Sequence, residues 1–410
     1  MKDIIIEVLI GALLGIVLSV GINYIMNDDR VSFGFDYDTD DYPDVVRDLD
    51  IDIDESDIEV TGYYYNQLDD TEKSIYRSLL SAVLSGTNYC SLSELQPYDS
   101  EVATSKLNRS NNALRMDHPE LFWLTTGFAL YKTSHDSNSF EYETVLAFRE
   151  FWKDNASPQT YFDVLMKKVN EVVASATDLP SDYDKALYFY EYVIDNTYYD
   201  YDRLNESEKT IHDPECELIY TAYGCLVEGR AVCAGYASAY QLLLRASGIN
   251  CYYVSGFAGE RGRAWNCVQL DGDFYQTDPT WGDDAFYDDD GLQYPDTINY
   301  SYFCLTSHEL EYDHTFNTSM FEVPYCISDK YNYYTYNGYI LYDYSKETLC
   351  DILSKQEGIT LRSVKIHDPD VYATAKNELP YDISDIESAL GSDLVFYTSK
   401  RPYIYVINQK

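Results

Sequence analysis

Basic residues are scarce in this chain of 410 residues: 29 Lys+Arg stand against 70 Asp+Glu, giving a formal net charge of −41. Nucleic acids and anionic lipid surfaces need Lys and Arg to neutralise phosphate, so this balance argues against both as partners. Hydrophobic residues make up 45% of the chain, which is ordinary for a folded protein and excludes wholesale disorder. The length predicts two or three domains.

Metal-binding patterns are missing as well. The six histidines form no H-E-x-x-H or H-x-H cluster, and the nine cysteines include no C-x-x-C spacing. We therefore expect no structural or catalytic metal and no cofactor. The odd number of cysteines leaves at least one thiol outside any set of disulfides.

Tyrosine, by contrast, is abundant, with 44 residues. An acidic, Tyr-rich surface stays soluble and still offers amphipathic rings to a partner. A compositional habit of the source organism explains the same number equally well.

One long apolar run lies at the amino terminus. Residues 8–26 carry no charge, which is enough length to cross a hydrocarbon core of about 30 Å. Lys2 precedes the run and two aspartates follow it, so the positive-inside tendency places everything after residue 27 outside the cell. We predict a single-pass anchor over 1–27 with an extracellular carboxyl-terminal portion. A cleaved signal peptide, giving a secreted protein, stays open as the alternative.

The rest of the chain divides into four regions. Residues 28–60 predict an acidic linker, and 61–178 a helical region with a helix start at Ser157-Pro158. Residues 179–315 contain the informative motifs, and 316–410 predict a small α/β region. In that last region we expect strands at 339–344 and 394–406 beside a helix near 346–355.

A cysteine at a predicted helix start is the main candidate for chemistry. Small residues surround Cys233 in the segment 229–235, and a helical pattern then runs to Gly248. The N–H groups and the dipole at a helix amino terminus stabilise a thiolate. A buried, inert cysteine fits this segment equally well.

A predicted β-hairpin follows the helix. Residues 264–270 and 274–277 alternate as strands around the turn Asp271-Gly272. This register places Trp265 opposite Asp278 and makes Arg263 and Asp278 diagonal neighbours, with Cα atoms roughly 7–8 Å apart. A cysteine at a helix start, a side chain on one strand and a carboxylate on the next have the layout of a thiol acyl-transfer triad.

These segments resemble the bacterial transglutaminase-like superfamily. The resemblance rests on 229–244, Gly248-Ile249-Asn250-Cys251, Val254-Ser255-Gly256, Ala264-Trp265-Asn266 and Asp278-Pro279-Thr280-Trp281. It extends over about 180–315, and the segment 117–123 resembles the helical region that often precedes this domain in exported members. The resemblance implies an α+β, papain-like fold: a helix carrying the cysteine packed on an antiparallel sheet, an N-terminal helical region and a small C-terminal α/β region.

The resemblance also assigns roles, and one position departs from it. Cys233 matches the family nucleophile and Asp278 the orienting carboxylate, whereas Arg263 occupies the position of the family histidine. Arginine has a pKa above 12 and cannot exchange protons near neutral pH, although it can hold a thiolate and pair with a carboxylate. Two other histidines of the resembling region, His308 and His314, have no predicted place beside the thiol.

We therefore predict a degenerate, membrane-anchored binding or scaffold module at the cell surface. Its partner would be a protein or peptide, with a cell-wall ligand among the candidates. The alternative is a thiol acyltransferase or amide hydrolase that acts on protein or peptide substrates through Cys233.

Four further positions remain open between two interpretations. Gln276 and Trp281 either line the cleft or belong to the core. Cys251 and Cys267 flank the stretch 257–262; a turn near its centre would let the two thiols form a disulfide, and otherwise they are two buried free thiols.

Overall fold

The structure is a computed structural model of the full chain. It describes residues 9–10, 49–51, 53, 62–136, 139–149, 157–207, 217–283, 286–287, 293–294, 297–398 and 401–408. Most of the predicted anchor and of the acidic linker lies outside these residues. Within the described part of the chain, no helix has both the length and the hydropathy of a membrane span.

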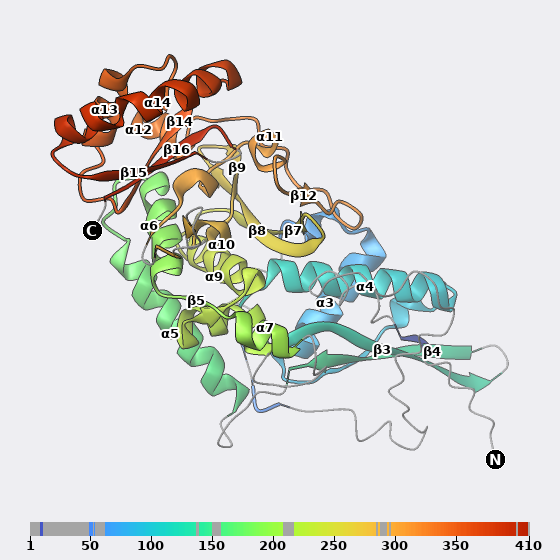
Figure 1. Ribbon diagram of the computed structural model, residues 1–410. Helices are drawn as coiled ribbons and strands as arrows, with labels where there is room; N and C mark the ends of the chain where they lie inside the picture. Colours follow the sequence, from blue (N-terminus) through green and yellow to red (C-terminus); the bar gives the residue numbers. More distant parts are fainter. Residues whose placement is uncertain are drawn as a thin grey trace. The chain divides into compact units, whose positions relative to one another are not determined.

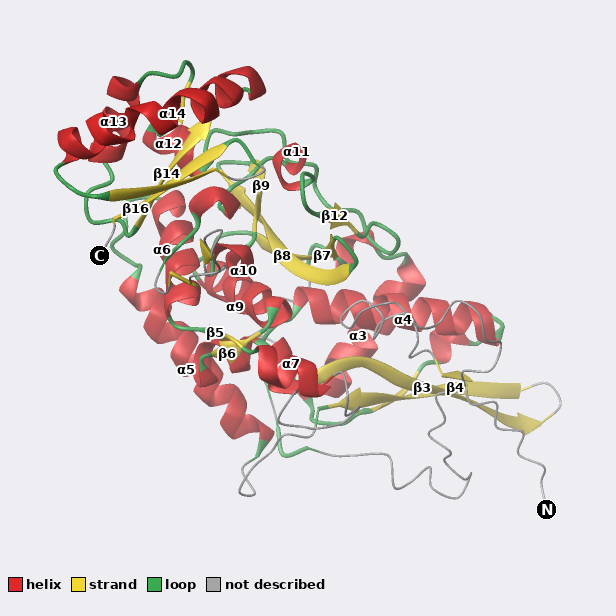
Figure 2. Cartoon of the chain, viewed as in Figure 1, coloured by secondary structure: helices red, strands yellow, loops and turns green. Residues whose placement is uncertain are grey.

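Two compact units make up the chain, and each combines stretches that are distant in sequence. The first unit comprises Met1–Asp178, Thr197–Asn266 and His314–Val323, and the second comprises Leu179–Asn196, Cys267–Asp313 and Pro324–Lys410. The boundary falls inside one strand, β8 (Arg261–Leu270). Figure 1 traces the elements along the sequence, and Figure 2 separates helices from strands.

The first unit contains helices, single helical turns and strands. Its helical elements are η2 (Tyr65–Gln67), α3 (Asp70–Leu84), η3 (Ser93–Leu95), α4 (Ser100–Asp117), α5 (Pro158–Ser175), α7 (Tyr201–Ser207), η4 (Leu218–Tyr220), η5 (Gly224–Glu228) and α9 (Cys233–Ala246). Its strands are β1 (Leu9–Ile10), β2 (Tyr89–Ser91), β3 (Leu124–Asp136), β4 (Ser139–Phe148), β5 (Tyr198–Tyr199), β6 (Arg230–Ala231), β7 (Cys251–Ala258), the first part of β8 and β12 (Thr315–Phe316).

The prediction that 61–178 is a helical region was wrong for its middle. β3 and β4 form a long antiparallel hairpin, which stands at the centre of a sheet in the order β1-β3-β4-β2. These stretches contain several Thr, Tyr and Phe residues, and such side chains favour the pleated surface once cross-strand neighbours exist. The flanking elements α3, α4 and α5 are helical, as expected for this region, and α5 begins at the predicted Ser157-Pro158, with Ser157 as its N-cap; Asp69 is the N-cap of α3.

The end of α4 is tied to the amino-terminal turns by a buried carboxylate. Asp117 accepts hydrogen bonds from the backbone N–H groups of Tyr64 (3.0 Å) and Tyr65 (2.8 Å). Burial raises the pKa of Asp117, and the two N–H donors act against that rise. Next to it, His118 Nδ1 and Glu120 Oε1 form a buried pair at 2.7 Å. The motif at 117–120 is therefore a packing element, which explains its polar residues without any chemistry.

Helix α9 is the buried helix of the first unit. Gln241 Nε2 donates to the Met116 carbonyl at 2.9 Å, and Arg245 donates to the Asp117 carbonyl, so the end of α4 holds the second half of α9. Asn266 Nδ2 donates to the Ala237 carbonyl at 2.9 Å and holds β8 against the first half. These side-chain bonds fix both the position and the rotation of the helix that begins at Cys233.

Strands β12, β7 and β8 lie side by side in the first unit, in that order. Trp265 on β8 is fully buried and packs edge-on against His314 and Phe316. Gly256 on β7 leaves the room for this indole, because a Cβ there would overlap the Trp265 ring. The Ala-Trp-Asn sequence thus combines a core anchor with a tether to α9.

The second unit continues from β8 through the predicted hairpin. Asp271 and Gly272 both have positive φ, 50° and 88°, which confirms the predicted two-residue turn. The other elements of this unit are α6 (Asp182–Asp195), β9 (Asp273–Thr277), α10 (Pro279–Gly282), β10 (Phe286–Tyr287), β11 (Gln293–Tyr294), η6 (Tyr300–Tyr302), α11 (Ser307–Leu310), α12 (Tyr333–Asn337), β13 (Ile340–Leu341), α13 (Lys346–Ser354), β14 (Leu361–Ile366), α14 (Pro369–Leu390), β15 (Leu394–Thr398) and β16 (Tyr403–Asn408).

The carboxyl-terminal part of the second unit has its own sheet, in the order β13-β14-β16-β15. Helices α13 and α14 pack on it through a core that includes Leu349, Val364, Ile386 and Val406 (Figure 2). The predicted α/β character is confirmed. Strand β14 and helix α14 were not predicted; the helix starts at Pro369 with Asp368 as its N-cap and contains Pro380.

A substitution at Gly235, in the first turn of α9, tests how tightly that turn is held. A Cβ at this position would lie 2.6 Å from the Ile219 carbonyl oxygen and 2.8 Å from Ala231 Cβ. We expect Gly235→Ala to lower the free energy of unfolding by about 1–3 kcal/mol, because overpacking against backbone outweighs the better helix propensity of Ala. Ser238→Ala, at a half-buried position of α9, is the control and should change it by less than about 0.5 kcal/mol. Denaturant titration measures both, and an unchanged or higher stability of Gly235→Ala would contradict this packing.

Candidate active site

Cys233 is the first residue of α9, as the sequence predicted. The preceding residue, Val232, is extended and has no side-chain acceptor, so no side chain caps the helix from that position. Gly235 and Tyr236 donate their N–H groups back to the Val232 carbonyl at 2.8 and 3.1 Å. The sulfur of a partly exposed cysteine therefore stands at the positive end of a helix of 14 residues.

The strand pair β5–β6 brings a tyrosine to this helix start. Tyr199 on β5 pairs in parallel register with Ala231 on β6, two residues before Cys233. Asp200, the residue after Tyr199, holds the strand pair together. Its carboxylate is fully buried and accepts a hydrogen bond from Arg230 Nε on β6 at 2.7 Å. Burial opposes the charge of Asp200, but the bonds from Arg230 and from the Arg203 N–H outweigh it and lower the pKa of the carboxyl.

Arg263 on β8 reaches the same tyrosine. Its Nη1 donates to the Tyr199 hydroxyl at 3.2 Å. Burial raises the pKa of Tyr199 above its ordinary value; the sulfur of Cys233 adds to that rise, and Arg263 acts against it. Cys233 and Arg263 are therefore both electrostatic neighbours of one phenol, and the structure brings these two predicted residues together around Tyr199.

Cys233 also affects the pKa of a second tyrosine, Tyr253 on β7. Burial raises its pKa first, Cys233 raises it further, and Arg115 and Arg149 lower it. Arg149 is held by the Leu124 carbonyl (Nη1, 3.0 Å) and by Glu217 (Nε to Oε2, 3.3 Å). Cys233 and the two arginines therefore all act on the phenol of Tyr253, as Cys233 and Arg263 both act on that of Tyr199.

Asp278, the third predicted residue, belongs to the second unit and is fully buried there. Its Oδ1 accepts from the N–H groups of Thr280 (2.8 Å) and Trp281 (3.2 Å), which makes it the N-cap of α10. Its own N–H donates to the Tyr302 carbonyl at 2.9 Å. The carboxylate is fixed in direction by its own helix start, and its role beside the thiol remains a prediction.

The structure describes the surroundings of four histidine side chains. His118 is paired with Glu120, His314 packs on Trp265, and His308 lies on α11. The ring of His367 is tilted by 45° against that of Tyr342, with the ring centroids 4.8 Å apart. In the residues that the structure describes, no group of three or more His, Cys, Asp or Glu side chains could hold a metal ion.

The structure also answers questions that the sequence left open for Gln276, Cys251 and Cys267. Gln276 is fully buried in the core of the second unit and donates to Cys326 Sγ at 3.1 Å. No disulfide joins Cys251 and Cys267, so the interpretation as two buried thiols is the correct one. Tyr199 and Tyr253 were missed, because nothing in the sequence distinguishes them among 44 tyrosines.

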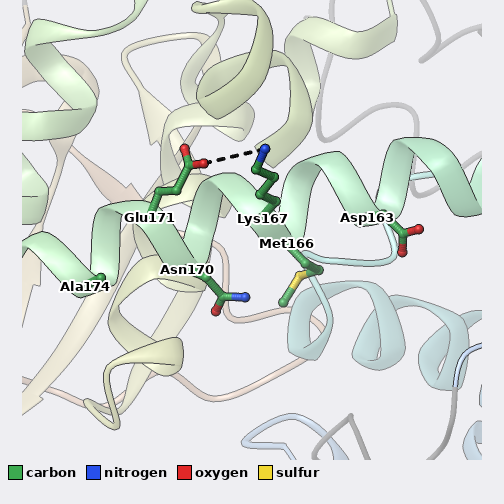
Figure 3. A pocket seen from close by; sticks show the side chains of 6 residues that line it. All are labelled: Asp163, Met166, Lys167, Asn170, Glu171 and Ala174. Carbon is green, nitrogen blue, oxygen red and sulfur yellow. Dashed lines mark ion pairs between the residues drawn. The ribbon is translucent and has the colours of Figure 1, made fainter.

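A pocket elsewhere on the surface contributes nothing to this site. Its lining comes entirely from α5 and includes Met166, Lys167, Asn170 and Glu171 (Figure 3). Lys167 Nζ and Glu171 Oε1 form an ion pair at 4.0 Å across one helical turn. With all its lining on one helix, it encloses no ligand from two sides.

Residues 169–279 match the family model of the transglutaminase-like superfamily. A curated relative, the kyphoscoliosis peptidase of Mus musculus, is 25% identical over 127 residues, which cover 28% of this chain and 18% of the mouse protein. The chain thus matches less than a fifth of that relative's length. The family match and the mixture of helices and strands confirm the predicted α+β, papain-like core.

Two solved structures are similar to parts of this chain. A TGase structure is 18% identical with a TM-score of 0.29, and the match covers 43% of this chain and 48% of that one. A candidate cysteine protease from Cytophaga hutchinsonii is 15% identical with a TM-score of 0.23, covering 37% and 61% of the respective chains.

Removal of the Arg263 charge should make Cys233 less reactive. We expect Arg263→Gln to slow iodoacetamide alkylation of Cys233 at pH 7 by about 3- to 10-fold, because a cation near the sulfur favours the thiolate that reacts. Arg261→Gln is the matched control, since Arg261 lies on the same strand but is exposed. Rates between pH 6 and 9, followed by mass spectrometry at Cys233, should show a higher midpoint for Arg263→Gln alone. Equal rates in both variants would place Arg263 outside the electrostatic range of the sulfur.

Proposed function

The chain carries a transglutaminase-like domain, and on that premise we propose that it is a degenerate member of its superfamily. In this proposal the domain binds a protein or peptide ligand at the Cys233 site and does not catalyse its turnover. The observation that carries it is Arg263, which stands at the family's histidine position and bonds to Tyr199 beside the cysteine.

An acyl-transfer cycle needs a group that both takes and returns a proton. A histidine accepts the thiol proton and later gives one to the leaving amine, which is worth about 10²–10⁴ in rate. Arginine keeps its proton at any pH near neutral. Tyr199 does not replace it, because burial raises the pKa of its hydroxyl and makes the phenolate costly to form. Arg263 and Tyr199 would therefore favour a thiolate at the site, and neither of them would complete the proton-transfer cycle.

A thiol acyltransferase or amide hydrolase is the second candidate. The placement of Cys233 at the first residue of α9, partly exposed and near Arg263, favours it, because a reactive nucleophile needs this setting. This candidate also accommodates a thiol that forms a single acyl adduct and then stops.

Restoration of the histidine separates the two candidates. Wild type, Arg263→His, Cys233→Ala and the double variant would be compared in amidase and transamidase assays on peptide substrates. We expect no turnover by wild type and measurable turnover by Arg263→His that disappears in the double variant. The gain should lie within about 10²–10⁴ over wild type, the usual contribution of general acid–base catalysis.

The opposite pattern would overturn the proposal. Wild-type turnover that is lost in Cys233→Ala would identify an enzyme and favour the second candidate. If iodoacetamide labels Cys233 in neither the wild type nor Arg263→His, the thiol is unreactive. Acyl transfer through Cys233 would then be excluded.

We also propose that the apolar run at the amino terminus anchors the chain, with the domain at the cell surface. The argument is the uncharged stretch 8–26 between Lys2 and the aspartates at 28 and 29. Protease added to intact cells should then degrade the transglutaminase-like domain, and deletion of residues 2–27 should abolish this sensitivity. A full-length chain that is cut only after lysis would contradict the proposal.

A further inference from the structure

Two cysteines of the second unit lie close enough to react with each other. Cys267 is on β8 and Cys326 lies between α11 and α12, 59 positions later, and their sulfur atoms are 3.8 Å apart. Both side chains are buried, with exposures of 0% and 1%. A disulfide needs an S–S separation of about 2.05 Å, so rotation about the side-chain bonds and a small backbone shift would close the gap.

The backbone around Cys326 is held in place by a polar network. The Cys326 N–H donates to Ser307 Oγ at 2.9 Å, and the Ser307 N–H donates to the Cys326 carbonyl at 2.8 Å. Gln276 Nε2 donates to Cys326 Sγ at 3.1 Å and to the Pro324 carbonyl at 3.3 Å. Gln276 itself is fixed by backbone bonds to Leu305 in both directions. The sulfur therefore has a defined position next to Cys267.

A third thiol nearby differs in character. Cys304 is fully buried, and burial raises its pKa well above the ordinary value. Bonds from Cys267, Ser307 and Gln276 instead lower the pKa of Cys326, although burial opposes them. Because the thiolate is the reacting form, Cys326 is a better candidate than Cys304 for the first reaction.

We propose that Cys267 and Cys326 are a modification site, at which a small hydroperoxide converts the two thiols into one disulfide. The Cys326 thiolate attacks the peroxide, so that an S–O bond forms, the O–O bond breaks and hydroxide leaves. The Cys267 sulfur then attacks the sulfenic acid; the S–S bond forms, the S–O bond breaks and water leaves. Two thiols and one hydrogen peroxide thus give one disulfide and two waters. A small oxidant is required because both sulfurs are buried.

The bond would join β8 to the segment that leads into the carboxyl-terminal sheet. Such a bond closes a long loop and restricts the unfolded chain, so the oxidised form should be the more stable one. For a loop of this length in a chain of this size, the rise in Tm should be on the order of 5–10 °C. The site is separate from Cys233 and does not depend on the proposed function.

The full chain in a Cys233→Ala background is the protein to test, since this change removes one of the two partly exposed thiols among the described cysteines, the other being Cys350. Hydrogen peroxide is added to the folded protein, remaining thiols are blocked with N-ethylmaleimide under denaturing conditions, and a digest without reductant is mapped by mass spectrometry. We expect a peptide pair linked through Cys267 and Cys326, two blocked thiols fewer, and a higher Tm that dithiothreitol reverses.

Serine variants provide the controls. Cys326→Ser should lose both the linked peptide and the rise in Tm, whereas Cys304→Ser should keep both. A link between Cys304 and Cys326, a sulfinic or sulfonic acid at Cys326 without any link, or no oxidation at either sulfur would each overturn the proposal. If a serine variant fails to fold, the peptide map of the Cys233→Ala chain alone decides between these outcomes.

Discussion

The close approach of the first turn of α9 to the backbone of residues 219–221 is the constraint on which the site depends. Gly235 permits it, because the Ile219 and Thr221 carbonyls occupy the space of a side chain. The Val232 N–H donates to the Ile219 carbonyl at 2.9 Å, so the residue before Cys233 is anchored to the same turn. A helix start fixed on two sides holds a sulfur in one place, which any use of that sulfur requires.

Charge around this helix start differs from charge in the chain as a whole. The chain has a net charge of −41, yet arginines lower the pKa of both tyrosines whose pKa Cys233 raises. Arg263 acts on Tyr199, and Arg115 and Arg149 act on Tyr253. Arg263, which bonds to the Tyr199 hydroxyl, would favour a thiolate or an anionic ligand at this site whichever of the two candidate functions is correct. The two candidates differ in whether the site can transfer protons. Arginine in place of histidine removes a proton-transferring group, but it keeps a positive charge that favours a thiolate.

Tyrosine content has a structural explanation that its abundance alone did not reveal. Among the twelve largest fully buried side chains of the described residues, eight are tyrosines. Several have a partner for the hydroxyl: Tyr190 donates to the Asn299 carbonyl at 2.8 Å, and Tyr334 bonds to Ser363 Oγ at 2.8 Å. Large rings fill the two cores while each hydroxyl remains satisfied, so burial accounts for a substantial part of the tyrosines.

The sequence by itself determined the local features: the helix start at Cys233, the N-cap at Ser157, and the turn at Asp271-Gly272. Each depends on residues a few positions apart, whose backbone preferences act in any context. The sequence also indicated the superfamily, because its motifs follow one another in order around one helix and one hairpin.

Tertiary structure decided the rest. The hairpin β3–β4 formed where helices were expected, because cross-strand neighbours outweigh weak local propensity. Tyr199 reached Arg263, which is 64 positions away, and Cys326 reached Cys267 across 59. Such pairs have no signature in spacing, since only the packing of strands and helices determines which distant residues meet.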